Sequence, residues 1–297
     1  MKEFSFRTRA ENIKRMESEE FDLAIIGGGI TGAGAARDAA SRGMKVALIE
    51  ARDFAFGTSS RSSKLIHGGI RYLENKEFKL VFEALSERRI LHEMAPNLVH
   101  PLRFVLPIFE GDRVSPWLMG VGMWLYDILA MFEAKMHEFL SPAESVERVA
   151  HLNEKGLRGS YVYSDAYMDD DRLVHATLRS ANELGAVCAN YVAATGAEFT
   201  GEKVTAVICA DQRSGRTFKL RARHIVSTVG PWTDRLGHSL FKNWKDILRP
   251  TKGVHVILER AKLPVNDAVV MSTRADKRIV FVIPRNEMVI VGTTDTD

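Results

Sequence analysis

Residues 21–50 read FDLAIIGGGITGAGAARDAASRGMKVALIE and combine an apolar strand, a glycine turn, a small-residue helix and a second strand. Gly27, Gly29 and Gly32 form G-x-G-x-x-G directly after the apolar run Leu23–Ile26. In a dinucleotide fold the first glycine permits a tight turn, the second lets backbone approach a pyrophosphate, and the third allows close helix packing. The helix start adds unpaired N–H groups and a partial positive charge. The pattern predicts a dinucleotide-binding unit rather than a purely structural glycine turn.

The acidic residue at the end of this stretch adds to the pattern. Glu50 follows Gly27 by 23 residues, close to the spacing of about 20 at which a carboxylate accepts hydrogen bonds from a ribose 2′-OH. The alanines in residues 33–40 keep the helix thin, and Gly43 ends it before the strand Lys45–Ile49. The order of strand, turn, helix, strand and acid therefore favours a nucleotide site.

The composition is that of a globular protein with one large or two interleaved domains. Of 297 residues, 45% are hydrophobic and 27% charged, and the net charge of +3 is too small to indicate nucleic-acid binding. Cys188 and Cys209 lie in apolar runs, so we expect buried thiols, a reducing compartment and no disulfides. Residues 1–20 carry five cations and five anions, which predicts a polar arm and neither a signal peptide nor a polybasic anchor. The histidines have no metal-ligand spacing.

The most hydrophobic tract is Trp117–Phe132, which contains Asp127. It is shorter than the roughly 20 residues that a membrane-spanning helix needs. The tract predicts a buried or interfacial helix, with a patch that dips into a membrane surface as the alternative.

Periodicity along the chain predicts further elements and an α/β fold class. Because parallel strands need a crossover, a helix between two strands of one sheet predicts a doubly wound arrangement. The predicted elements are helices at residues 78–94 and 172–184, a strand at 186–192, a buried strand at 224–229, and a hairpin of strands 203–209 and 217–221. We therefore expect a Rossmann-like domain with a β-meander, interleaved with an α+β domain.

The expected domain limits follow from these elements. The polar arm takes residues 1–20, the Rossmann-like domain residues 21–75 and 160–235, and the second domain residues 76–159 and 236–297. In the second domain we expect helices between residues 78 and 150, and then strands at residues 254–258, 279–283 and 288–291.

The loop at residues 57–73, GTSSRSSKLIHGGIRYL, distinguishes between a flavin and a nicotinamide dinucleotide as the cofactor. It holds five hydroxyl residues, a glycine pair and His67 without helical or strand periodicity. Such a loop can wrap a ligand with hydroxyl and backbone donors, whereas a nicotinamide fold usually continues into another strand and helix. The loop favours a flavin.

With this loop included, the chain resembles the FAD-dependent glycerol-3-phosphate dehydrogenases of the D-amino-acid-oxidase-like flavoprotein superfamily. The resemblance covers nearly the whole chain and rests on several motifs together. These are FSFRTR, IIGGGITGAGAARDAASRG, TSSRSSKLIHGGIRYLE, MAPNLVHP, DDDRLV, GPWTD, RPTKGVH, KRIVFVIPR and GTTDT.

The resemblance implies which residues bind FAD. The glycine turn and its acid would hold the AMP half, and the hydroxyl loop would wrap the pyrophosphate and the flavin. The backbone at Val192 would touch the adenine side, and Gly230 would approach the cofactor from the end of its strand. The family usually has Ala-Thr-Gly-Pro-Trp there, whereas Val229 precedes the glycine in this chain, so the hydroxyl at that position is missing and the backbone approach is kept. The implied FAD-binding residues are Gly27, Gly29, Gly32, Glu50, Thr58, Ser59, Ser60, Lys64, Leu65, His67, Val192 and Gly230.

The chemistry that the resemblance implies is oxidation of sn-glycerol 3-phosphate to dihydroxyacetone phosphate. A hydride leaves C2 for FAD, a base takes the C2 hydroxyl proton, and the electrons pass to a quinone. His67 is the first candidate for the base, because imidazole accepts protons near neutral pH; the alternative is a histidine that only hydrogen-bonds FAD. Arg71 and Lys252 are the candidates for the substrate phosphate, although Lys252 also fits a surface strand cation.

Two alternatives stay open at this point: an oxidase that passes the electrons to O₂, and a truncated FAD-binding fragment without catalysis. Family members continue beyond GTTDT with further flavin and substrate segments, so we expect this chain to bind FAD weakly and to turn over slowly. The expected partners are the phosphorylated substrate, the quinone and, as further options, a membrane surface and a second copy. The expected location is cytoplasmic or peripheral on the inner face of the cytoplasmic membrane.

Overall fold

The computed structural model describes residues 3–273 and 279–294. The ends of two motifs quoted above, residues 277–278 and 295–296, lie outside the described residues. By its internal contacts the chain divides into two compact units, and each is described by itself. Unit 1 consists of Met1–Ser62 and Asp170–Pro250, and unit 2 of Ser63–Asp169 and Thr251–Asp297.

These limits differ from the domain ranges expected from the sequence. Residues 63–75 and 160–169 belong to unit 2, because β3 and β6 in these segments pair with each other and β6 also pairs with β4. Residues 236–250 belong to unit 1, where the helix α7 contacts the strand β8. Each unit is nevertheless assembled from two separate stretches of the chain.

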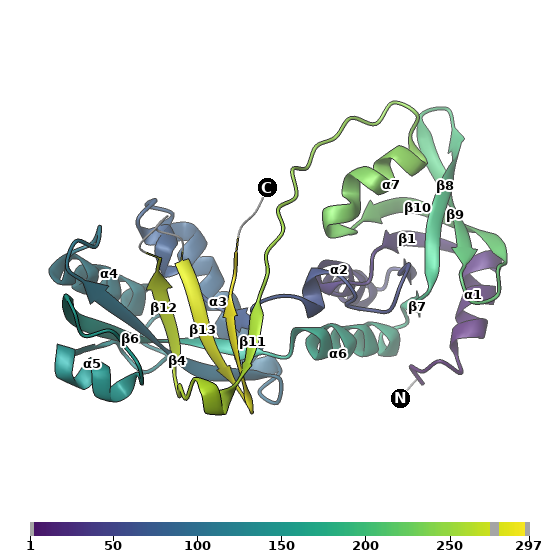
Figure 1. Cartoon of the computed structure of the whole chain (residues 1–297). Helices are drawn as coiled ribbons and strands as arrows, with labels where there is room; N and C mark the ends of the chain where they lie inside the picture. The colour runs from purple at the N-terminus through teal and green to yellow at the C-terminus, as the bar shows by residue number, and fades with distance from the viewer. Residues whose placement is uncertain (1–2, 274–278, 295–297) are drawn as a thin grey trace. The chain divides into compact units, whose positions relative to one another are not determined.

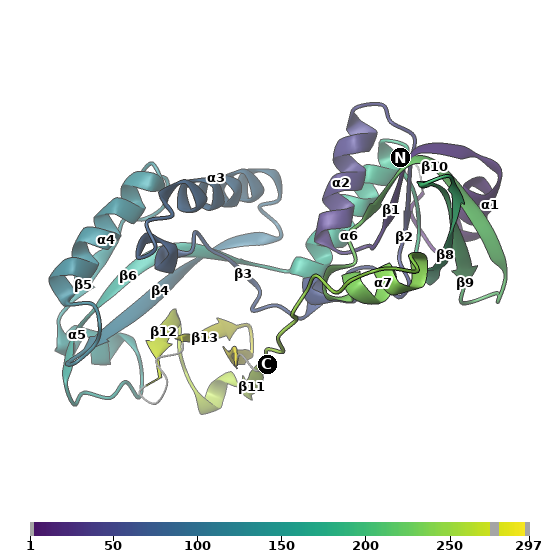
Figure 2. The ribbon, with the colours of Figure 1, turned by 90° about the horizontal axis from the view of Figure 1, so that it is seen from above.

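Unit 1 is built on a six-stranded sheet in the order β7-β2-β1-β10-β9-β8 (Figure 1, and Figure 2 for β2). The strands β7, β2, β1 and β10 run parallel, while β9 pairs antiparallel with β10 and with β8. This confirms the predicted Rossmann-like domain with a β-meander, and α6 precedes β7 as the expected crossover helix. The strands are β1 (Glu20–Ile26), β2 (Val46–Ile49), β7 (Val187–Ala189), β8 (Val192–Thr200), β9 (Lys203–Asp211) and β10 (Thr217–Ser227). The helices are α1 (Arg9–Ser18), α2 (Ile30–Ser41), α6 (Asp170–Glu183) and α7 (Thr233–Leu240), with 3-10 turns η1 (Thr58–Ser60) and η3 (Gly230–Trp232).

The parallel strands β7, β2 and β1 have apolar residues packed on both faces, as expected for a doubly wound sheet. On one face, Ile25 and Leu48 pack with Ala33 of α2 and with α6. The helices α2 and α6 pack against each other on this face (Figure 2). On the other face, Ile26 packs in a cluster with Met16 of α1. Alternate residues of β1 thus serve opposite faces, which fixes the register of the sheet.

The N-terminal arm carries a helix that packs on unit 1. Met16 of α1 is fully buried in the core. Arg9 donates from Nε to the Asn190 carbonyl oxygen at 2.9 Å and forms an ion pair with Asp211. The arm, expected to be polar, therefore contributes both apolar and ionic contacts to the domain.

The two strands predicted at residues 217–221 and 224–229 are one strand in the structure. The strand β10 runs unbroken because residues 222–223 carry no turn signal and Ala222 and His224 continue the pairing with β1. The expectation that residues 224–229 are buried is also wrong, since Val226 is 39% exposed.

Unit 2 is built on a second sheet in the order β11-β14-β13-β12-β4-β6-β3, with β5 paired to β6. Its longest pair joins β4 antiparallel to β6. The expectation of helices throughout residues 78–150 is wrong where β4 and β5 lie, but the helix at residues 78–94 and the three C-terminal strands are confirmed. The strands are β3 (Leu65–Ile66), β4 (Val99–Phe109), β5 (Glu138–Leu140), β6 (Leu157–Met168), β11 (Val256–Glu259), β12 (Ala268–Ser272), β13 (Ile279–Arg285) and β14 (Met288–Gly292). The helices are α3 (Phe78–Met94), α4 (Pro116–Leu129) and α5 (Pro142–Arg148), with 3-10 turns η2 (Ile70–Leu73) and η4 (Arg260–Lys262).

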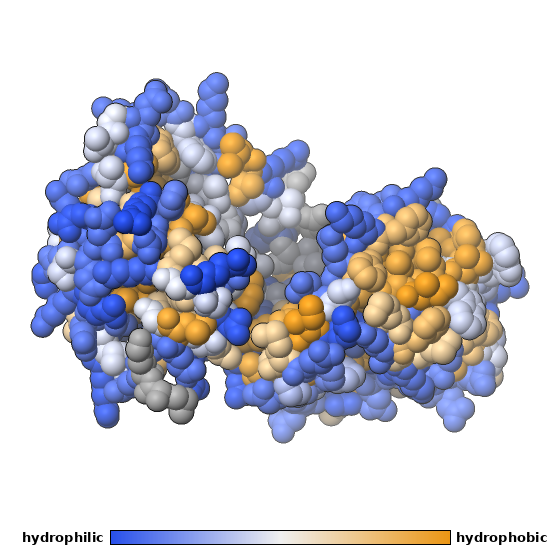
Figure 3. Space-filling view, turned by 180° about the vertical axis from the view of Figure 1, so that it is seen from behind, coloured by the Kyte–Doolittle hydropathy of each residue, from blue (hydrophilic) through white to orange (hydrophobic). Residues whose placement is uncertain are grey.

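The hydrophobic tract forms the helix α4, and only one face of this helix is buried. Met123 and Tyr126 are 0% and 1% exposed, whereas Trp117 and Trp124 are 78% and 52% exposed. Figure 3 shows the broad apolar surface of this unit. None of the helices within residues 3–273 and 279–294 is long and apolar enough to cross a membrane.

Candidate functional site

Three loops of unit 1 leave the sheet at the same edge. The strands β2, β1 and β10 lie side by side and run parallel, so their carboxyl ends coincide. Glu50, Gly27 and Thr228 follow these three ends. Ligands of open α/β sheets bind outside the carboxyl ends of the strands. The edge at β2, β1 and β10 is therefore the candidate cofactor site of this unit.

The glycine turn has the geometry that the sequence predicted. Gly27 has a φ of +115°, which a residue with a side chain rarely adopts. A Cβ atom at Gly27 would lie 2.7 Å from the Thr228 carbonyl oxygen, and one at Gly32 would run into the Gly27 carbonyl oxygen. The first glycine thus makes the turn and the third lets α2 approach it.

The carboxylate of Glu50 is oriented by two backbone donors. Gly28 N–H donates to Oε2 at 2.7 Å, and Arg52 N–H donates to Oε1 at 2.8 Å. A carboxylate oxygen can accept a second hydrogen bond, so both oxygens keep acceptor capacity for hydroxyl groups. The arrangement fits a ribose, whose hydroxyls would be the donors.

A serine from the hydroxyl loop caps the helix that follows the glycine turn. Gly29 is the N-cap of α2 and offers no side-chain acceptor. The Ser59 hydroxyl instead accepts a hydrogen bond from Ile30 N–H at 3.0 Å. The first N–H groups of a helix bind acceptor oxygens, including those of phosphates. The helix start and Ser59 therefore fit a pyrophosphate, and this fit carries the assignment of a dinucleotide to the site.

Other predicted residues of unit 1 have local roles in the structure. Ser60 donates from its hydroxyl to the Gly57 carbonyl oxygen at 3.2 Å, within the turn η1 that also contains Thr58. Val192 N–H donates to the Glu50 carbonyl oxygen at 2.8 Å, so this donor already has a partner within unit 1. Gly230 has a φ of +57° and open space where a side chain would begin.

Thr228 is a residue of this site that the sequence analysis missed. Its hydroxyl donates to the carbonyl oxygens of Ile26 at 3.1 Å and Gly27 at 3.0 Å. The family pattern places a hydroxyl one residue later, at the position of Val229 here. Thr228 thus ties the end of β10 to the glycine turn, and its place directly before the Val-Gly-Pro-Trp stretch was the available signal.

The remaining predicted residues lie in unit 2. Lys64 has a φ of +61°, and Leu65 begins β3. His67 is exposed, and its ring stacks with Phe281 at a centroid distance of 6.4 Å. Arg71 is exposed on the turn η2, four residues after His67, and Lys252 is exposed before β11. The candidate base and one candidate phosphate ligand thus belong to one short segment.

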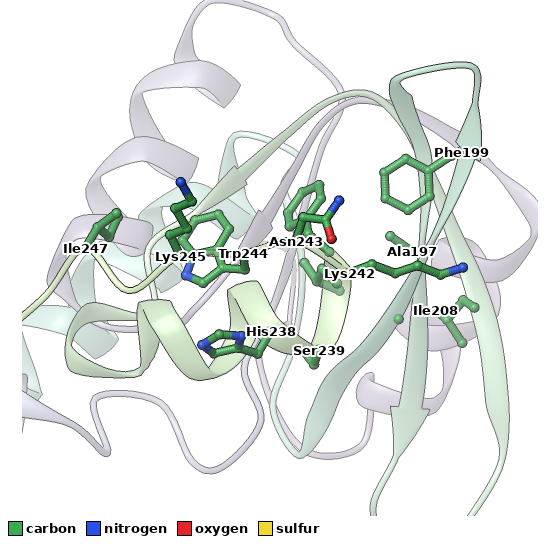
Figure 4. A pocket seen from close by; sticks show the side chains of 13 residues that line it. Ala197, Phe199, Ile208, His238, Ser239, Lys242, Asn243, Trp244, Lys245 and Ile247 are labelled. Carbon is green, nitrogen blue, oxygen red and sulfur yellow. The ribbon is translucent and has the colours of Figure 1, made fainter.

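Unit 1 also has a groove away from the glycine turn. A groove of about 980 Å³ lies between α7, the following segment and the meander strands (Figure 4). Phe199, Phe241 and Trp244 line it, and Lys242 and Lys245 are among its cations. None of the predicted site residues lines this groove, so it is not the candidate cofactor site.

Comparison with known proteins identifies relatives along the whole chain. An alpha-glycerophosphate oxidase of Streptococcus pneumoniae is 41% identical over 302 residues, which cover 99% of this chain and 50% of the relative. An aerobic glycerol-3-phosphate dehydrogenase of Staphylococcus saprophyticus is 39% identical over 291 residues, which cover 97% of this chain and 52% of the relative. The crystal structure of a glycerol-3-phosphate dehydrogenase from Bacillus halodurans, complexed with FAD, matches with a TM-score of 0.81 and 32% identity, covering 99% of this chain and 51% of that chain.

The chain spans about half the length of these relatives. The model of a family described as FAD dependent oxidoreductase matches residues 22–297, nearly the whole chain. This match and the structural relative confirm the predicted flavoprotein class, with FAD as its cofactor. The chain belongs to the FAD dependent oxidoreductase family.

Proposed function

We propose that this chain is the FAD-binding and substrate-binding part of an enzyme that oxidises sn-glycerol 3-phosphate to dihydroxyacetone phosphate. The cofactor half of the proposal is supported by the glycine turn, with Glu50 and Ser59 beside it. The substrate half is supported by the names of the two relatives at 41% and 39% identity.

FAD would be held in unit 1 by backbone and side-chain groups already in position. Gly29 and the start of α2 would face the pyrophosphate together with Ser59, and Glu50 would accept from the ribose. Thr58, Ser60, Val192 and Gly230 complete this proposed set in unit 1, and Lys64, Leu65 and His67 are its proposed members in unit 2. FAD, when bound, supplies the acceptor for the hydride that leaves C2 of the substrate.

The residues of unit 2 would supply the proton acceptor and the phosphate ligands. His67 would take the proton of the C2 hydroxyl on an imidazole nitrogen, because a neutral imidazole is a suitable base near pH 7. The planar guanidinium of Arg71 suits two phosphate oxygens, and Lys252 would add a compact positive charge. Both cations are exposed, so a phosphate in solution can reach them.

A visible spectrum of the purified, FAD-reconstituted chain tests the main proposal. A flavin band that bleaches when glycerol 3-phosphate is added supports cofactor and substrate together. A flavin band that the substrate does not bleach supports the fragment without catalysis. A protein that stays colourless after reconstitution contradicts the cofactor assignment itself.

We propose a quinone as the electron acceptor, with O₂ as the alternative. The dehydrogenase relative favours the first and the oxidase relative the second, at 39% and 41% identity. The peroxide yield per substrate oxidised, measured with and without a soluble quinone analogue, separates them. Stoichiometric peroxide in the presence of the quinone would contradict the proposal.

We also propose that α4 touches the lipid surface where a quinone would be found. Its exposed face carries Trp117, Val121, Trp124 and Ile128, each 48% exposed or more. Asp127, the helix's charged residue, is buried and accepts a hydrogen bond from the His137 backbone N–H at 3.1 Å, so it is turned away from that face. An apolar stripe with tryptophans is typical of helices that lie in a membrane interface.

Co-sedimentation with vesicles of phosphatidylglycerol and phosphatidylethanolamine tests this contact. We expect the double variant Trp117→Ser, Trp124→Ser to lose most of the binding. Phe199→Ser, which removes an apolar side chain that is 44% exposed on unit 1, is the matched control and should bind like the unchanged protein. Equal binding of both variants would contradict a role of α4.

A further inference from the structure

A buried polar cluster lies inside unit 2, next to the segment that carries His67 and Arg71. It consists of Arg88 from α3, Tyr126 from α4 and Asp165 from β6, whose exposed fractions are 7%, 1% and 4%. Three secondary-structure elements thus each contribute one polar side chain to a single point of an otherwise apolar core.

The members of the cluster bind one another. Arg88 forms an ion pair with the Asp165 carboxylate and donates to the Ser164 carbonyl oxygen at 2.9 Å. The Tyr126 hydroxyl donates to the carboxylate, 2.9 Å from each oxygen. Burial and the charge of Asp165 raise the pKa of Tyr126 well above its ordinary value, so this hydroxyl keeps its proton and remains a donor.

The cluster also holds one backbone group of the candidate active-site segment. Gly68 N–H lies 3.0 Å from the Tyr126 hydroxyl oxygen and 3.2 Å from Asp165 Oδ1, and both can accept its hydrogen bond. A Cβ atom at Gly68 would lie 2.5 Å from the Tyr126 hydroxyl oxygen, so a side chain has no room there. The peptide that links His67 to Gly68 is therefore fixed from the core side.

The direction of the chain after this point is fixed as well. Gly69 has a φ of +69° and is the N-cap of the turn η2, which carries Arg71. Tyr72 lies against Gly69 where a side chain would begin. The exposed His67 and Arg71 thus flank two buried glycines, the first of which is bound by the cluster.

We propose that Tyr126, Asp165 and Arg88 are positioning residues, which set the placement of His67 relative to Arg71 by holding the Gly68 backbone. This rests on the proposed function, in which His67 takes the proton and Arg71 holds the phosphate. A buried ion pair adds little net stability compared with well-packed apolar side chains, so its presence calls for another role. Fixing the chain between a base and a phosphate ligand is such a role, because small displacements of catalytic groups lower rates strongly.

The test compares Tyr126→Phe with Tyr163→Phe. Tyr163 is 3% exposed, belongs to the same core cluster and packs edge-on against Tyr126 at a centroid distance of 5.7 Å. Within the described residues its hydroxyl makes no hydrogen bond to Gly68 or Asp165, so the two variants lose the same atom but only one loses the contact. Each substitution keeps the aromatic ring and removes only the hydroxyl, so we expect both variant proteins to fold.

Amide hydrogen exchange of Gly68 and the NMR titration of the His67 imidazole are the first readouts, since neither needs turnover. We expect Tyr126→Phe to lower the protection of Gly68 by about 10-fold, as for one lost hydrogen bond, and to move the His67 signals. Tyr163→Phe should change neither. Equal changes in the two variants, or an unchanged Gly68 in Tyr126→Phe, would overturn the proposal.

The rate of flavin bleaching by glycerol 3-phosphate is the second readout. If the unchanged protein bleaches, Tyr126→Phe should bleach more slowly at saturating substrate, and Tyr163→Phe should not. If the unchanged protein does not bleach, the proposed function fails, and the exchange and titration results still decide whether the cluster holds Gly68 and places His67.

Discussion

Two glycines on the same helix provide a direct test of the cofactor turn. Gly32 and Gly34 both lie in α2, where an alanine is favoured over glycine by about 0.5–1 kcal/mol. At Gly34 a new Cβ atom meets nothing within 4 Å. At Gly32 it would lie 2.7 Å from the Thr228 hydroxyl oxygen and still closer to the Gly27 carbonyl oxygen. The two substitutions therefore share the gain in helix propensity and differ in the clash.

The expected difference follows from these distances. Gly34→Ala should raise the free energy of unfolding by about 0.5–1 kcal/mol. Overpacking typically costs about 1–3 kcal/mol, and the upper end applies at Gly32 because backbone cannot rotate away as a side chain does. Gly32→Ala should therefore be about 2–3 kcal/mol less stable than Gly34→Ala.

Urea unfolding followed by far-UV circular dichroism measures this difference, and flavin content after reconstitution with FAD reports on the site. We expect Gly32→Ala to unfold at lower urea and to retain less flavin. If both variants unfold at the same urea concentration with equal slopes, α2 does not approach Gly27 as closely as described, and the reasoning fails.

Three other outcomes can be measured on the same protein. Burial raises the pKa of Asp211, but the hydrogen bonds from Arg9, Ser214 and the Arg213 backbone N–H together outweigh it, and the pKa falls from 3.8 to about 2. The resulting stabilisation is present above pH 4 and is lost as the pH falls towards 2. Asp211→Asn should therefore lower the free energy of unfolding, measured with urea, by about 1–2 kcal/mol at pH 6 and by progressively less below pH 4. Burial also raises the pKa of Cys188 and Cys209 to about 12, so a thiol reagent at pH 8 should modify them only after unfolding. Ser141 caps α5 in a capping box, and Ser141→Ala should lower the free energy of unfolding by about 1 kcal/mol, read from the shift in urea midpoint.

Local patterns in the sequence predicted much of unit 1. The apolar run, the glycine turn and the alanine-rich helix each follow from neighbours within a few residues, and Glu50 follows from a fixed spacing. The helix α3 has the predicted limits, Phe78–Met94, because its apolar spacing is regular and Pro96 follows it.

The central strand of unit 2 was missed for a specific reason. Pro101 and Pro107 argue against a central strand, because proline cannot donate to a neighbouring strand. In the structure β12 pairs with β4 only at Phe104 and Val105, between the two prolines. The prolines thus lie where β4 has a paired neighbour on the β6 side alone, which only the three-dimensional pairing reveals.

The predicted site residues fall into two groups by the same logic. The glycine turn and Glu50 have the expected geometry because backbone requirements select their residue types. The importance of Tyr126 and Asp165 could not be predicted, because a single polar residue in an apolar run does not reveal which backbone group it binds. Thr228, in contrast, could have been found from its place directly before the Val-Gly-Pro-Trp stretch. The roles of His67, Arg71 and Lys252 stay predictions.

In both units a side-chain hydroxyl holds a segment that contains a glycine. Thr228 places its hydroxyl where a side chain at Gly32 would begin, and the same hydroxyl donates to Gly27. The Tyr126 hydroxyl likewise lies where a side chain at Gly68 would begin, and its oxygen accepts a hydrogen bond from Gly68 N–H. In each case a hydroxyl lies in the space that a side chain at the glycine would fill, and from there it binds the backbone. A substitution at the glycine would therefore also displace this hydrogen-bond partner. The effects of changing the glycine and its partner should therefore not add. Neither Gly32 nor Gly68 has a positive φ, so both glycines are required by the close packing of their neighbours and not by their own backbone angles.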